Sequence, residues 1–253
     1  MEILAAEAAK LGICLSAGQI EKFARYEVLL SDWNKKFNLT AMAGGEIIYK
    51  HFADSLSAVK HIGAGAQRVI DIGSGAGFPG IPVSIARPDI KMTLLDATGK
   101  KIAFLEEAIR SLGLENVNCV QARAEAAGRG HDFRENFDAA VGRAVAPLYI
   151  LAEYALPFVK TGGKLVALKG PGAEKEITEA EKIIKILGGE IYGIFPAFFT
   201  VRSKDGTTET VRHRIVVINK TGRTPEKYPR ENNAIKRGRN AKNNASKGGL
   251  NNE

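Results

Sequence analysis

From residue 67 onward, short runs of apolar and β-branched residues alternate with longer stretches whose apolar positions recur every three or four residues. The short runs are typical of buried strands, and the longer stretches are typical of helices that cover a sheet. The predicted strands are residues 67–73, 91–96, 117–122, 137–144, 163–169, 190–200 and 212–220. The predicted helices between them are residues 81–87, 100–113, 147–163 and 174–189.

This alternation predicts an α/β fold with a mostly parallel sheet and helices on both of its faces, joined by right-handed crossovers. No long connection separates the last two strands, so we expect them to join the same sheet as an antiparallel hairpin. The main domain is therefore predicted to span residues 67–220.

Residues 1–66 are predicted to form a helical extension that precedes the sheet, with helices at residues 2–13 and 17–36. The second helix carries a mostly apolar stripe from Ile20 to Trp33 at helical spacing, and Ser16 is a suitable N-cap. Such a stripe is typical of packing, and we expect it to pack against the main domain. A loop and a further helix follow before residue 67.

The chain has 253 residues, of which 45% are hydrophobic and 25% charged, the balance of a soluble globular protein. No apolar stretch approaches the roughly 20 residues of a membrane span, and the acidic N-terminus has no basic segment typical of a signal peptide. The two cysteines, Cys14 and Cys119, have no CxxC partner, so no metal site is expected. Two thiols without a disulfide framework favour a reducing, cytoplasmic location.

The net charge of +8 is concentrated near the C-terminus. Residues 220–253 contain nine Lys or Arg and three Glu, so six of the eight net positive charges lie there. Residues 221–253 are predicted to be a basic, disordered tail, because the segment after Arg230 has almost nothing apolar to bury. A basic tail is typical of proteins that bind polyanions, first nucleic acid and second anionic membranes, although it also serves solubility alone.

A glycine-rich stretch, VIDIGSGAGFPGIP at residues 69–82, directly follows the first predicted strand. In an open parallel sheet a ligand binds beyond the carboxyl ends of the strands, where glycine lets the ligand approach the backbone. Asp96 ends the next strand, 23 residues beyond Gly73. A carboxylate at that place can accept the hydroxyls of a ribose, so the pair predicts an adenosine-containing cofactor. The alternative is a tight turn beside an exposed acid.

The identity of the cofactor follows from the register of this stretch. Residues 75–80 match the GxGxxG pattern of dinucleotide sites, but Asp71 and Gly73 come first and place a carboxylate where a phosphate would be repelled. S-adenosylmethionine has a ribose, no phosphate and two cationic groups. The sequence therefore favours S-adenosylmethionine over NAD.

Several motifs resemble the RsmG family, also called glucose-inhibited division protein B, over residues 33–230. They are WNKKFNLTA, HFADSL, DIGSGAGFPGIP, LLDATGKKIAFLEE, the RAE of residues 123–125, RAVAPL, LPFVKTGGKLVALKG and PEKYPR. The resemblance implies a class I, Rossmann-like methyltransferase fold and methylation of guanine N7 in 16S ribosomal RNA, at its 530 loop. After residue 230 the chain departs from the family pattern.

The resemblance also implies the cofactor contacts and the partners. The cofactor contacts carried over are Gly73, Phe78, Asp96, Ala97, Thr98, Ala124, Glu125 and Arg143. The implied substrate is 16S rRNA or a small-subunit particle, with no membrane or metal partner, and a monomer is expected.

The chemistry of the acceptor agrees with guanine N7. Residues 142–147 read GRAVAP in place of the (D/N)PP(Y/F) loop of exocyclic-amine methyltransferases, and neither cysteine is placed to attack a cytosine ring. N7 carries a lone pair at neutral pH, so no general base is required. The substrate-binding candidates are Arg143, Lys169, Asn38 and His51.

Other roles remain open at this stage. Arg143 and Lys169 are equally interpretable as solvated charges at strand ends, and His51, with Asp54, as a packing residue near the cleft. The alternative functions are a small-molecule or protein methyltransferase on the same fold, or a non-catalytic RNA-binding protein.

Overall fold

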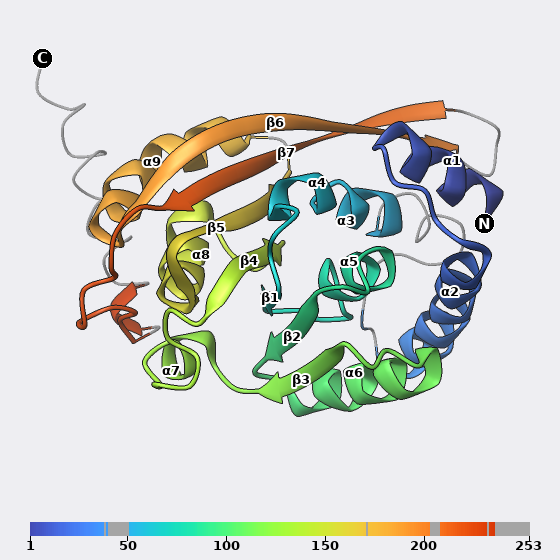
Figure 1. Cartoon of the computed structure of the whole chain (residues 1–253), viewed down its shortest axis with the longest axis horizontal. Helices are drawn as coiled ribbons and strands as arrows, with labels where there is room; N and C mark the ends of the chain where they lie inside the picture. Colours follow the sequence, from blue (N-terminus) through green and yellow to red (C-terminus); the bar gives the residue numbers. More distant parts are fainter. Residues whose placement is uncertain (38, 40–50, 171, 203–207, 232, 236–253) are drawn as a thin grey trace, which may run out of the picture.

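The computed structural model describes residues 1–37, 39, 51–170, 172–202, 208–231 and 233–235. Its centre is a seven-stranded sheet in the order β3-β2-β1-β4-β5-β7-β6 (Figure 1). The strands are β1 (Arg68–Ile72), β2 (Lys91–Asp96), β3 (Val117–Gln121), β4 (Phe137–Arg143), β5 (Val159–Lys169), β6 (Gly189–Arg202) and β7 (Thr208–Lys220). The first five pair in parallel, and β7 pairs antiparallel with both β5 and β6. The predicted α/β class and the antiparallel late hairpin are confirmed.

Helices cover both faces of the sheet, as predicted. One hydrophobic core lies beneath α1 (Glu2–Lys10), α2 (Ala17–Phe37), α3 (Asp54–Leu56), α4 (Val59–Ile62), α5 (Gly80–Ala86) and α6 (Gly99–Leu112). A second core, on the opposite face, lies beneath α7 (Ala124–Ala127), α8 (Leu148–Ala155) and α9 (Ala173–Ile186). Val69 belongs to the first core and Ile70 to the second, because successive strand side chains point to opposite faces.

The helix predicted at residues 147–163 is shorter in the structure. The α-helical part ends at Ala155, a 3-10 turn follows at Leu156–Phe158 (η2), and β5 already begins at Val159. Pro157 explains the early end, since proline lacks the N–H group that would continue the helical hydrogen bonds.

The β6–β7 pair extends beyond the rest of the sheet. β7 pairs with β5 only as far as the Lys169–Arg214 pair, whereas its pairing with β6 continues to Arg202 and Thr208. In Figure 1 this two-stranded ribbon runs along one long side of the molecule, over α3 and α4. Its inner face contacts the α3 region through Phe199, which packs against Ala53.

The segment after β7 is packed against the domain where the structure describes it. Within residues 221–231, Arg230 forms a bidentate ion pair with Glu153 of α8, whose side chain is fully buried. Arg129 and Arg134, which follow α7, donate to the backbone carbonyls of Pro229 and Tyr228, at 2.9 and 2.8 Å.

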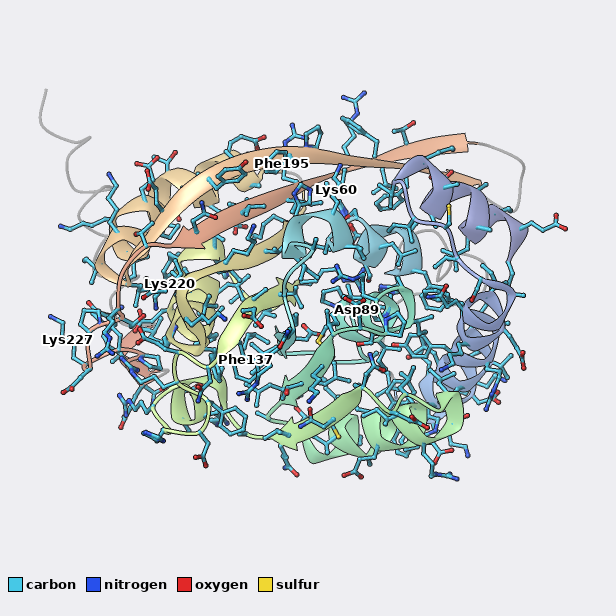
Figure 2. All side chains as sticks on the ribbon, viewed as in Figure 1. Lys60, Asp89, Phe137, Phe195, Lys220 and Lys227 are labelled. Atoms are coloured by element: carbon cyan, nitrogen blue, oxygen red, sulfur yellow. The ribbon has the colours of Figure 1, made fainter. Side chains whose placement is uncertain are left out.

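The expectation of disorder from residue 221 is therefore wrong for this part of the predicted tail. The sequence argument weighed only apolar content, whereas charged side chains of the main domain hold this backbone. Figure 2 shows Lys220 and Lys227 at the end of the molecule where β7 leaves the sheet. Residues 236–253, which carry most of the tail's lysine and arginine, lie outside the described residues.

Candidate functional site

A pocket of about 290 Å³ lies at the carboxyl ends of β1, β2, β3 and β4. Its lining residues are Ile72, Gly73, Leu95, Asp96, Ala97, Lys101, Ala122, Arg123, Ala124, Glu125, Ala144, Val145 and Tyr154. Five of the predicted cofactor contacts line this pocket, namely Gly73, Asp96, Ala97, Ala124 and Glu125. Parallel strands bring these positions together because their carboxyl ends share one edge of the sheet.

Asp96 is one of two acids that line this pocket, with Glu125, and is only 6% exposed. Its Oδ1 accepts the backbone N–H of Thr98 at 2.9 Å, and its Oδ2 accepts the N–H of Gly75 at 3.0 Å. Lys101 Nζ lies 3.4 Å from the same Oδ2. Each carboxylate oxygen offers two lone-pair directions, so Oδ1 retains one acceptor position and Oδ2 offers another if Lys101 moves aside.

The glycines of the glycine-rich stretch have two roles: Gly73 lines the pocket, and Gly80 allows α5 to pack on the sheet. Gly73 lines the pocket with a φ of +68°, and a Cβ there would come within 3.0 Å of the Val145 side chain. Gly80, in contrast, starts α5, where a Cβ would overlap the Leu94 side chain. Gly80 is therefore required for helix–strand packing, a role that the sequence argument did not assign to it.

Asp71 does not face the pocket. Its side chain is fully buried, Oδ2 accepts the N–H of Gly80 at 2.9 Å, and Oδ1 has no hydrogen-bond partner among the described residues. Burial raises the pKa of this carboxyl to about 7, an effect that the nearby Arg143 partly opposes. The sequence argument placed this carboxylate beside the ligand, whereas it anchors the first turn of α5.

The raised pKa of Asp71 predicts a pH-dependent stability. Between about pH 4 and pH 7 the folded protein retains a proton that the unfolded chain has released, so stability falls as pH rises through this window. Asp71→Asn keeps an acceptor for Gly80 but has no charge to bury. We expect the stability of the variant, relative to wild type, to increase with pH by up to about 4 kcal/mol across the window. Urea unfolding of both proteins from pH 4 to 8 measures this, and parallel curves would contradict it.

Arg143 forms a second polar cluster beside the pocket with His51 and Asp54. Its Nη1 donates to Asp54 Oδ2 at 3.1 Å, its Nη2 contacts His51 Nδ1, and its guanidinium lies 4.8 Å from the Phe78 ring centroid. His213 of β7 contacts the other oxygen of Asp54 at 2.8 Å. Arg143 is followed directly by Ala144 and Val145, which line the pocket.

The predicted contacts Phe78, Thr98 and Arg143 are thus adjacent to the pocket without lining it. Phe78 is buried and stacks on His51, with ring centroids 4.4 Å apart. Thr98 contributes its backbone N–H to Asp96. His51 is itself buried in this cluster, at 7% exposure.

Lys169 is also buried, at 7% exposure. Its ammonium group donates to the carbonyl of Ala146 at 2.8 Å and pairs with Glu176 at 2.6 Å. Glu176 in turn accepts the N–H of Leu148 at 2.8 Å, so this pair fixes the loop between β4 and α8. Asn38, the remaining substrate candidate, lies outside the described residues.

Among the lining residues that sequence reasoning missed, three have polar side chains, namely Lys101, Arg123 and Tyr154. Lys101 and Arg123 were quoted only within motifs, although Arg123 lies two positions after the end of β3 and Lys101 lies in the first turn of the helix that follows β2. Tyr154 lies in an apolar helix and carried no such signal. Among the residues described, no group of three His, Cys, Asp or Glu side chains is arranged to hold a metal ion. None of the described helices is long and apolar enough to cross a membrane.

This chain is similar in sequence to one group of known proteins and similar in fold to another. A family model described as "GidB: rRNA small subunit methyltransferase G" matches residues 19–197. A protein of Thermoanaerobacter sp. (strain X514) named ribosomal RNA small subunit methyltransferase G is 44% identical over 242 residues, which are 94% of this chain and 97% of the relative. A protein of the same name from Clostridium beijerinckii is 44% identical over 231 residues, 90% of this chain and 94% of the relative.

Among solved structures, precorrin-6y C5,15-methyltransferase from Geobacter metallireducens superposes with a TM-score of 0.51 at 17% identity. The superposition covers 66% of this chain and 87% of that protein. At this identity the similarity supports the fold alone, and it agrees with a methyltransferase-type sheet.

Proposed function

Because this chain belongs to the GidB family, described as rRNA small subunit methyltransferase G, we propose that it transfers the methyl group of S-adenosylmethionine to N7 of a guanine in 16S rRNA. The observation that carries the proposal is the pocket that Gly73 and Asp96 line at the carboxyl ends of the strands, in a chain of this family. The reaction would take place in the cytoplasm, on rRNA or a small-subunit particle.

The residues of the pocket fit S-adenosylmethionine. Asp96 Oδ1 has an acceptor position for one ribose hydroxyl, and Oδ2 gains a position for the second if Lys101 releases it. Ala124 and Glu125, which begin α7, offer a backbone and a side chain to the adenine. Gly73 lets the cofactor lie against the backbone, since no Cβ separates them. Bound here, the cofactor would supply an electrophilic methyl carbon.

The chain's own task in this reaction is alignment. The N7 atom of guanine already holds a lone pair, so no residue needs to remove a proton. The polar cluster of Arg143, His51 and Asp54 holds the end of β4 firmly beside the pocket, where the acceptor must line up with the methyl carbon. Arg143 is the residue of this cluster that we assign to the guanine O6 or to a neighbouring phosphate.

Transfer of tritium from labelled S-adenosylmethionine tests the proposal. The acceptors are deproteinised 16S rRNA, small-subunit particles and a small-molecule extract, each offered separately to the purified protein. We expect label in rRNA, either free or in the particle, and its release with 7-methylguanine after hydrolysis. Label only in small molecules or protein would support the other methyltransferase functions. Binding of rRNA with no transfer to any acceptor would indicate a non-catalytic RNA-binding protein.

A further inference from the structure

Two motifs far apart in the sequence, WNKKF at residues 33–37 and TGKK at residues 98–101, meet beside the pocket. Helix α2 ends at Phe37 and α6 begins at Gly99, and the two helices pack against each other (Figure 1). The Trp33 and Phe104 ring centroids are 5.5 Å apart, and Lys100 Nζ lies 5.3 Å from the centroid of the Phe37 ring. The contact therefore joins the end of α2 to the beginning of α6.

This junction presents a lysine patch, which consists of Lys35, Lys36, Phe37, Lys100 and Lys101. Lys36 and Lys100 are exposed, and Phe37 keeps 39% of its surface exposed although it packs on Trp33. Among the described neighbours, Asp32 pairs with Lys35, and the nearly buried Asp96 pairs with Lys101, which leaves Lys36 and Lys100. The patch thus retains a net positive charge around one exposed aromatic ring.

The placement of the two lysines in α6 is unfavourable for the helix itself. The backbone N–H groups at a helix N-terminus carry a partial positive charge, so acidic residues are favoured there and cations are not. The first turn of α6 contains Lys100 and Lys101 but no acid, and Thr98 makes no side-chain capping bond. A bound phosphate would offset this repulsion, because helix N-termini and lysines both attract anions.

The lysine patch is continuous with the proposed methyl-transfer pocket. Lys101 belongs to both, since it lines the pocket and lies 3.4 Å from Asp96. From these contacts we propose that the lysine patch is a docking surface for single-stranded rRNA next to the target guanine. Lys36 and Lys100 bind backbone phosphates, and a base stacks on the Phe37 ring when Lys100, which lies over that ring in the free protein, moves to its phosphate. This inference rests on the proposed function, since it names the surface through which that substrate is held.

Paired substitutions of the full-length protein test the patch. The test variant is Lys36→Gln with Lys100→Gln, and the matched control is Lys182→Gln with Lys185→Gln, two exposed lysines of α9. Lys101 is left intact, because it lines the pocket. Binding of a deproteinised single-stranded rRNA fragment is measured between 0.1 and 1 M salt, together with the affinity for S-adenosylhomocysteine and the KM and kcat of methyl transfer.

We expect the test variant to reduce the log–log salt slope by about 1.4, since each phosphate contact contributes about 0.7. Over this tenfold range of salt, the reduced slope corresponds to about 25-fold weaker binding at 0.1 M if the affinities agree at 1 M. KM for rRNA should rise similarly, with kcat and cofactor affinity within about twofold of wild type. Phe37→Ala should weaken rRNA binding about tenfold without changing the slope, because stacking releases no counterions.

The results separate the patch from the proposed function. If wild type labels rRNA but the Lys36/Lys100 variant behaves like the α9 control, the lysine patch is not the docking surface. An unchanged affinity in Phe37→Ala would refute base stacking on this ring. If wild type transfers no methyl group to rRNA although it binds S-adenosylhomocysteine, the proposed function fails whatever the variants show.

Discussion

Arg230→Met is expected to lower the free energy of unfolding by about 3 kcal/mol, because it leaves the carboxylate of Glu153 buried without a charged partner and with only the backbone N–H of residue 230 as a donor. Glu153 is fully buried, and the Arg230 side chain, at 37% exposure, makes two hydrogen bonds to it at 2.9 and 2.7 Å. For a chain of this length such a loss corresponds to a decrease in Tm of roughly 6 to 12 °C. Urea denaturation and thermal unfolding at pH 7 measure both quantities.

Arg223→Met is the matched control for this substitution. Arg223 is 91% exposed and lies 4.0 Å from Glu135, so its loss should change stability by less than about 1 kcal/mol. The double substitution Glu153→Met with Arg230→Met should recover most of the lost stability, since no charge then remains buried. Equal stabilities of Arg230→Met and Arg223→Met would show that the segment around Arg230 does not brace α8.

Asp96→Ala is expected to weaken the affinity for S-adenosylhomocysteine by roughly 10- to 150-fold. The substitution removes charge-assisted hydrogen bonds to the ribose, which contribute about 1.5–3 kcal/mol. It also releases the N–H groups of Gly75 and Thr98, which Asp96 accepts at 3.0 and 2.9 Å. Calorimetric titration of both proteins measures the change.

Asp96→Asn is a partial control for the backbone contacts, because its amide oxygen keeps an acceptor for one of the two N–H groups. We expect an intermediate loss of affinity, and thermal unfolding checks that both variants remain folded. NAD should bind to neither wild type nor variant. An unchanged dissociation constant in Asp96→Ala would place the ribose elsewhere in the pocket.

The sequence was sufficient to predict the sheet and one end of the pocket. Apolar runs identify the parallel strands because a strand covered on both faces has few polar positions, and Asp96 ends such a run. The same reasoning predicted Gly73, because it directly follows the last residue of β1 in the sequence. These positions depend on local pattern and on the shared edge of parallel strands. Glu125, which lies shortly after the end of β3, was implied by the family resemblance.

Side-chain direction and ion pairing could not be predicted in this way. Lys169 ends a strand like Asp96 does, yet it turns inward to Glu176 and Ala146, which lie on segments that only the fold brings near. Asp71 also lies near the end of a strand, where the sequence argument placed it beside the ligand. Its side chain instead accepts the N–H of Gly80 and is buried beneath α5. Arg230 lies in a polar segment, and its packing against α8 depends on the ion pair with Glu153, 77 positions earlier.

The contacts of the segment around Arg230 form late during protein synthesis, because this segment follows the sheet in the sequence. Glu153 neighbours Tyr154, which lines the pocket, and Arg129 holds the carbonyl of Pro229 just after α7. Pro229 and Arg230, which make these contacts, are added by the ribosome only after the last strand, β7. A growing chain that already contains the glycine-rich loop therefore still lacks the contacts that Pro229 and Arg230 make with Arg129 and Glu153.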